Sequence, residues 1–230
     1  LRTTGIDLYN IIGCKTFTFG MFNKSLASDI IPFNLFDFHK NTSGDGTVPL
    51  ASAQSILADS ENIFFAPKAE HAKMPSANGI RQTIVNLLTG SSLDTESILT
   101  HEFVQQYPEK CQLKGEVIKI KSPVAIEAID QNDNRVGIAE DGSIENSIPG
   151  ADYQVWGEHK YVFLPTGDGE QYAINLKGTG NGTFTLQQET IQNDQSVQTQ
   201  VFSNIPVTPN LTGQLQISNQ AILLLDTDSN

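Results

Sequence analysis

Residues 43–50 have the sequence Ser-Gly-Asp-Gly-Thr-Val-Pro-Leu. Glycine flanks Asp45 on both sides, and glycine adopts the sharp backbone turns that other residues resist. The Asp45 carboxylate is therefore expected at the tip of a tight turn. Pro49 suits the first turn of a helix, so a helix is predicted over residues 50–57.

The second candidate residue is a histidine that follows this turn in the chain. Residues 62–67 predict a short buried strand, and His71 lies in the loop that leaves it. A helix is predicted from Pro75 to near Gly90, its C-cap, with apolar positions at Ile80, Ile84, Val85, Leu87 and Leu88. An acid that orients a histidine is two thirds of a nucleophile–base–acid triad. The alternative is an ordinary surface turn, since Gly-Asp-Gly recurs at 167–169, and a solvated loop histidine.

A family resemblance rests on two segments. Gly-Asp-Gly-Thr-Val-Pro-Leu-x-Ser-Ala at 44–53, preceded by Leu-Tyr-Asn-Ile-Ile-Gly-Cys at 8–14, resembles the lecithin–cholesterol acyltransferase-like lipases, a branch of the α/β-hydrolases. The resemblance covers residues 1–90. It implies that Asp45 is the triad acid and His71 the base, in the chain order serine, acid, histidine. The aromatic residues 14–42 would line an acyl site or form a hydrophobic hairpin packed on the core.

The nucleophile of such a triad is missing. No Gly-x-Ser-x-Gly occurs in the 230 residues, and Ser43 lacks the strand–turn–helix elbow that a nucleophile needs. The nucleophile and the oxyanion hole are therefore expected upstream of Leu1, and this chain alone is expected to be inactive. A sheet cut at that point exposes an edge, so the N-terminal part of the same protein, or a second copy, is expected to cover it.

The character of the sequence changes near Cys111. Short alternating apolar runs separated by Gly, Asn, Asp and Pro predict a β-sandwich, loosely similar to the immunoglobulin-like modules of bacterial extracellular enzymes. The expected fold class is α/β, the C-terminal portion of an α/β-hydrolase sheet, plus an all-β sandwich. The expected domains are residues 1–90 and 112–230, joined by a connector, 91–111, in which His101 is structural or solvated.

Charge and length exclude some functions. The net charge is −12, of which residues 112–230 contribute −9, with 6 Lys and Arg against 15 Asp and Glu. Such a chain repels nucleic acid and anionic membrane surfaces. No apolar run approaches the length of a membrane span. An ester or lipid substrate, no cofactor and an extracellular or cell-surface location are expected.

Three further residue groups have a structural and a functional interpretation. Cys14 and Cys111 belong to no CxxC pair, so no zinc site is expected, and buried free thiols are favoured over a bridge. Residues 130–134 resemble the start of a calcium loop, but Arg135 replaces its glycine and Asp141 its closing glutamate, which favours a polar hairpin turn. A sugar platform is possible at Tyr153, Trp156 and Tyr161, where core aromatics are favoured.

Two functions follow from these observations. The first is a lipase, esterase or acyltransferase in which this chain supplies the acid and the base. The second is a non-catalytic extracellular binding or adhesion module, in which the sandwich is the working part and residues 1–110 are a remnant.

Overall fold

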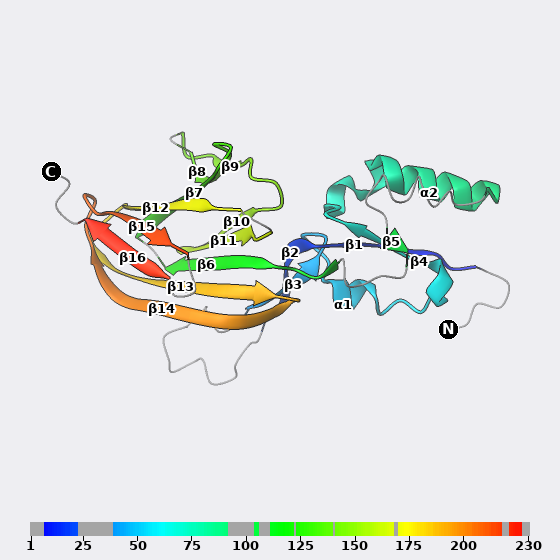
Figure 1. The fold of residues 1–230 in the computed structure, drawn as a ribbon, viewed down its shortest axis with the longest axis horizontal. Coiled ribbons are helices and arrows are strands. Elements are labelled where there is room, and N and C mark those ends of the chain that lie inside the picture. Colours follow the sequence, from blue (N-terminus) through cyan, green and yellow to red (C-terminus); the bar gives the residue numbers. More distant parts are fainter. Residues whose placement is uncertain are drawn as a thin grey trace. The chain divides into compact units, whose positions relative to one another are not determined.

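The computed structural model describes residues 7–22, 39–91, 104–105, 111–121, 123–139, 141–167, 170–217 and 221–226. The chain divides into two compact units, Leu1–Leu113 and Lys114–Asn230, and Figure 1 shows the strands that dominate it. Across the described residues, no helix has both the length and the apolar character needed to cross a membrane.

The first unit contains a small mixed sheet and a separate hairpin. In the sheet, β1 runs parallel to β4, and β5 pairs antiparallel with the other edge of β4. The hairpin consists of β2 and β3, which pair antiparallel. The elements of this unit are β1 (Asn10–Cys14), β2 (Thr16–Phe22), β3 (His39–Gly44), α1 (Leu50–Ala53), the 3₁₀ turn η2 (Ser60–Asn62), β4 (Ile63–Pro67), the 3₁₀ turn η3 (His71–Ser76), α2 (Asn78–Thr89) and β5 (Val104–Gln105).

The expected α/β fold class is wrong. Strands far outweigh helices, most strand pairs are antiparallel, and only β1 and β4 among the described strands pair parallel. An α/β sheet needs a covering helix in each crossover. Here the chain between β1 and β4 contains the β2–β3 hairpin and only the four-residue helix α1, and α2 is the only described helix of more than six residues.

Of the two predicted helices, the first is shorter than predicted and the second ends where predicted. The first ends at Ala53, well short of residue 57, and beyond it the backbone N–H and the hydroxyl of Ser55 both donate to the Ser52 carbonyl, three residues back. The second, α2, ends at Gly90, which adopts the left-handed conformation at φ 63° as a C-cap should. Of its five predicted apolar positions, Ile80 is buried and Leu87 packs on a small core cluster. The other three, Ile84, Val85 and Leu88, are exposed.

The second unit contains two antiparallel sheets. One has the strand order β10-β11-β6-β13-β14, and the other has the order β16-β15-β12-β7-β8-β9. Their bounds are β6 (Gly115–Lys121), β7 (Val124–Asp130), β8 (Arg135–Ile138), β9 (Ile144–Asn146), β10 (Asp152–Trp156), β11 (His159–Pro165), β12 (Tyr172–Gly178), β13 (Gly182–Gln192), β14 (Gln195–Val207), β15 (Thr212–Gln216) and β16 (Ile222–Asp226).

One apolar cluster joins these two sheets. In β7, Val124, Ile126 and Ala128 are buried while the residues between them are partly exposed, which confirms the alternation expected there. Ile118 from β6 and Phe184 from β13 belong to the same cluster. Side chains from both sheets therefore fill a single core, as in a two-layer sandwich.

Candidate active site

The acid and the base of the candidate site come from the loops that follow β3 and β4. His71 begins η3, four residues after β4 ends, and Asp45 directly follows β3. Asp45 also forms an isolated bridge with Thr16, just beyond the end of β1. Because β1 and β4 are parallel, their carboxyl ends lie at the same edge of the sheet. The two loops therefore converge at this edge.

Hydrogen bonds hold the Asp45 side chain in one orientation. Its residue is only 6% exposed. Oδ1 accepts the backbone N–H groups of Thr47 at 3.0 Å and Val48 at 2.7 Å. Oδ2 lies 2.8 Å from Nδ1 of His71, and the backbone N–H of His71 donates to the Asp45 carbonyl at 2.8 Å. Both carboxylate oxygens therefore have fixed partners, and the base is tied to the acid twice.

Two glycines make this arrangement possible. Gly46 has φ 89°, a conformation that side chains disfavour, and its N–H donates to Oγ1 of Thr18 at 2.9 Å. Gly13, in β1, lies so close to the acid that an added Cβ would come 2.6 Å from Cβ of Asp45. The glycine turn inferred from residues 43–50 is thus present, and Gly13 belongs to the segment 8–14 that carries the family resemblance.

His71 has the chemical form of an oriented general base. A carboxylate can only accept, so Nδ1 of the imidazole donates to Asp45, and in the neutral ring Nε2 keeps its lone pair. The His71 side chain is 51% exposed, which leaves it accessible to a reacting group. An acid, an oriented imidazole and an accessible face are what a triad requires of these two members.

The Ser43 hydroxyl forms structural hydrogen bonds to the backbone. It is fully buried, its hydroxyl accepts the N–H of Lys15 at 2.7 Å, and it donates to the carbonyl of Cys111. A hydroxyl has one proton to donate, and that proton is used here. Ser43 therefore does not act as the attacking group, in line with its rejection from the sequence.

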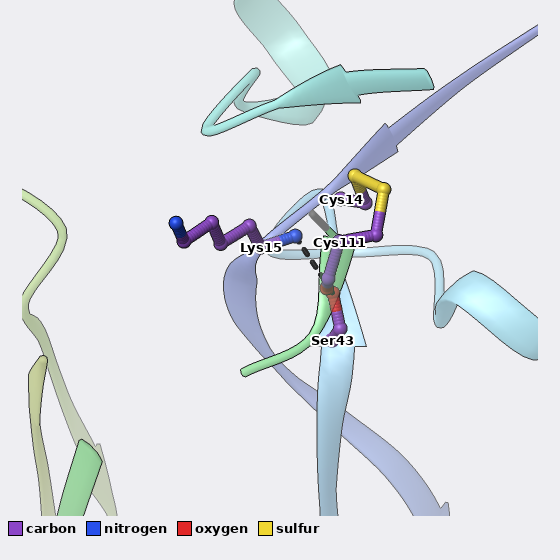
Figure 2. Close-up of a disulfide and its surroundings, with 4 residues drawn as sticks. All are labelled: Cys14, Lys15, Ser43 and Cys111. Carbon is purple, nitrogen blue, oxygen red and sulfur yellow. Dashed lines mark hydrogen bonds between the residues drawn. A yellow bond between two sulfur atoms is a disulfide. The ribbon is translucent and has the colours of Figure 1, made fainter. Parts of the chain in front are cut away.

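The expectation of free thiols is wrong. Cys14 and Cys111 form a disulfide, with their Cα atoms 5.2 Å apart, beside Lys15 and Ser43 as Figure 2 shows. Both residues are fully buried. Two cysteines 97 positions apart carry no pairing signal in the sequence, because only the fold brings Cys111 to the end of β1.

The other candidate residues in the second unit are structural. Asp130 accepts N–H groups from Asn132 and Asn134 in the β7–β8 turn, and the Asn134 side-chain bond is the main cause that lowers the pKa of Asp130. This is a polar hairpin turn. Tyr153 and Tyr161 are 5% and 1% exposed, so they are not a sugar platform.

The described residues do not include every residue for which the sequence predicts a role. Phe33, Phe36, Phe38, His101 and most of the connector lie outside the described residues. Within the part that is described, no three His, Cys, Asp or Glu side chains gather as metal ligands would.

A groove crosses the outer face of the six-stranded sheet. It has a volume of about 1150 Å³ and is lined by residues from all six strands. Cross-strand register places Gln214 beside Asn175, Asn175 beside Glu127 and Glu127 beside Gly137. Glu127 also holds Arg135 at 2.6 Å. The groove thus presents a row of amide and carboxylate side chains, with no aromatic residue among those that line it.

A smaller cavity lies at Glu116. Its volume is about 420 Å³, and Glu170 and Tyr172 also line it. Burial raises the pKa of Glu116, opposed by hydrogen bonds from Gln188 and Thr190. Oε1 of the buried Gln188 has no hydrogen-bond partner.

Comparison with known proteins returned no match, whether to protein-family models, to curated proteins or to solved structures.

Proposed function

We propose that this chain supplies the acid and the base of a carboxylic ester hydrolase or acyltransferase whose serine nucleophile lies outside these 230 residues. One observation carries the proposal: His71 Nδ1 is 2.8 Å from an Asp45 carboxylate whose other oxygen is held by two backbone N–H groups. A surface turn with a solvated histidine has no need of this double fixation.

The roles follow from the chemistry of the two groups. His71 Nε2 would take the proton of a serine hydroxyl as the serine attacks the ester carbonyl, and would return a proton to the leaving alcohol. Asp45 would keep the imidazole in the tautomer with its proton on Nδ1 and stabilise the imidazolium that forms. Water or a second alcohol would then release the acyl group. Lipids and other acyl esters are equally compatible substrates.

A covering partner belongs to this proposal. Among the described strands, β1 pairs only with β4, so its other edge has no described strand beside it. Ile84, Val85 and Leu88 expose apolar surface on α2, and Leu57 is 84% exposed. We infer that an N-terminal part of the same protein, or a second copy, covers these surfaces. The buried disulfide favours an oxidising compartment, extracellular or at the cell surface.

The test is hydrolysis of p-nitrophenyl butyrate. The chain alone is expected to give no turnover, and a longer protein that includes the preceding sequence is expected to be active. In the longer protein, Asp45→Asn should lower kcat by about 10⁴-fold. Asp59→Asn is the matched control, because Asp59 is an exposed aspartate outside the site. Turnover by the chain alone that His71→Ala removes, or an Asp45→Asn variant of normal activity, would refute the proposal.

The groove on the six-stranded sheet favours the second candidate, a binding module. Its row of Gln214, Asn175 and Glu127 offers donors and acceptors, and Arg135 offsets the Glu127 charge. A neutral, hydroxyl-rich ligand such as an oligosaccharide matches this chemistry better than an anion does, given the charge of −9 over residues 112–230.

Calorimetric titration of the chain with neutral oligosaccharides tests this alternative. Binding that Asn175→Ala and Gln214→Ala both weaken would support it, with Gln195→Ala, at an exposed glutamine outside the groove, as the control. No heat of binding across a panel of neutral glucans, mannans and galactans would count against it.

A further inference from the structure

The disulfide encloses the whole candidate site within one covalent loop. Cys14 ends β1 and Cys111 lies 97 residues later, so Asp45 and His71 both fall between them. Both cysteines are fully buried, which keeps reductants from the sulfur atoms. The bond is therefore part of the buried core of the first unit.

Ser43 connects this disulfide to the acid. Its hydroxyl sits between the backbone N–H of Lys15, next to Cys14, and the backbone carbonyl of Cys111, as Figure 2 shows for the first contact. Ser43 therefore bonds to the chain at both ends of the bridge. Only Gly44 separates it from Asp45, and the packing at Gly44 is tight, because a Cβ added there would clash with Thr18 and the Val48 carbonyl. A shift of Ser43 is thus passed on to the acid.

The same strand end also holds the loop that leads to the base. The carbonyl of Cys14 accepts the N–H of Lys68 at 2.7 Å, and the loop continues from Lys68 to His71. At Gly13, beside Cys14, an added Cβ would lie 2.6 Å from Cβ of Asp45 and 2.9 Å from Sδ of Met74, so both loops pack against this position. The cystine is therefore where the supports of the acid loop and of the base loop meet.

We propose that Ser43 is a positioning residue, which couples the Cys14–Cys111 disulfide to the Asp45–His71 pair. Its catalytic meaning rests on the function proposed above, but the coupling itself is a property of the chain and is measured without activity. The Ser43 hydroxyl reaches neither a substrate nor His71. It acts by fixing the backbone from which the acid projects.

Backbone amide exchange of the chain, followed by NMR, tests the coupling. The amides of Thr47, Val48 and His71 donate to Asp45 and report its order. Ser43→Ala should speed their exchange about tenfold, the effect of losing roughly one hydrogen bond, while the Arg81 amide in α2 stays unchanged. Ser55→Ala is the matched control, because Ser55 is an exposed serine that also bonds a backbone carbonyl.

A double-mutant cycle separates coupling from simple loss of a contact. In a chain that carries Cys14→Ala and Cys111→Ala, under conditions in which the Arg81 amide of α2 stays protected, the effect of Ser43→Ala on the three amides should shrink, because the carbonyl of residue 111 is no longer held in place. Full additivity of the substitutions would overturn the proposal. So would unchanged exchange in Ser43→Ala, or loss of protection throughout the first unit, α2 included, which would mark a general structural role.

The activity of a longer protein gives the last readout. Ser43→Ala should lower kcat at least tenfold and leave KM unchanged, since it disturbs orientation and not substrate binding. A change in KM as large as the change in kcat would contradict the proposal. If the longer protein hydrolyses no ester at all, the proposed function fails, while the exchange results still decide whether Ser43 couples the disulfide to Asp45.

Discussion

The two units of this protein differ in the apolar cores that stabilise them. The second unit has one continuous core cluster with 18 buried residues among those described, drawn from both sheets. Two described clusters of the first unit are smaller, with 5 and 3 buried residues, and the larger of the two contains the disulfide. A small core needs a covalent cross-link or a partner to remain folded. The comparison indicates that the first unit depends on its bridge and the second does not.

Removal of the disulfide should have the largest effect on stability. Cys14→Ala with Cys111→Ala opens a loop of 97 residues, for which chain entropy predicts a loss of about 4.7 kcal/mol. Calorimetry should show the first unit unfolding at a much lower temperature and the second unit unchanged. An unchanged first transition would mean that the small clusters suffice without the bridge.

A buried ion pair offers the matching test in the second unit. Lys119 Nζ lies 2.7 Å from Glu189, and their side chains are 3% and 12% exposed. Lys119→Met leaves a carboxylate without this cation in a buried place and should cost about 3–5 kcal/mol in urea denaturation. Adding Glu189→Gln should recover most of the loss. A single variant within about 0.5 kcal/mol of wild type would show that the pair contributes little.

Glu116 should give a smaller effect, of the opposite sign. Burial raises its pKa above 4.5, so the folded unit binds this proton more tightly than the unfolded chain does. The stability that the protonated group contributes is therefore present below pH 4.5 and is lost as the pH rises through the higher folded pKa. Glu116→Gln should stabilise the unit at pH 7 by about 0.5–1.5 kcal/mol and flatten this part of its pH profile. A Glu116→Gln variant that is less stable than the wild type in denaturation at pH 7 would contradict this expectation.

Isolation of the second unit should have the smallest effect. Residues 114–230 contain the whole described cluster, so they should unfold cooperatively within about 4 °C of the same transition in the full chain, a difference below roughly 1 kcal/mol. A segment that is unfolded by circular dichroism would show that the two units share their stability.

The sequence predicted the local features of the molecule and failed on the long-range ones. The acid turn follows from two glycines around Asp45, and the end of α2 follows from Gly90, because such signals act within a few residues. Alternation in β7 was visible because a half-buried strand repeats every second residue. Strand order carries no such local signal, so β6 between β11 and β13 was not predictable.

The two errors have the same origin. The Cys14–Cys111 bridge and the strand pairing that decides the fold class both depend on contacts between distant segments. The α/β class was extended from one parallel pair, β1 with β4, to a whole sheet, whereas the chain continues into an antiparallel hairpin. The contact between Asp45 and His71 was nevertheless anticipated correctly, although Asp45 follows β3 of the hairpin and not a strand of the sheet that contains β4.

Covalent labelling tests the central claim most directly, namely that Asp45 and His71 activate a serine outside these residues. A longer protein that includes the preceding sequence is treated with a fluorophosphonate, and mass spectrometry locates the labelled residue. The account predicts a label on a serine outside residues 1–230, formed about 10⁴-fold more slowly in His71→Ala and at the normal rate in Lys73→Ala, a change at an exposed residue of the same loop. A label on Ser43, or a labelling rate that does not depend on His71, would contradict it.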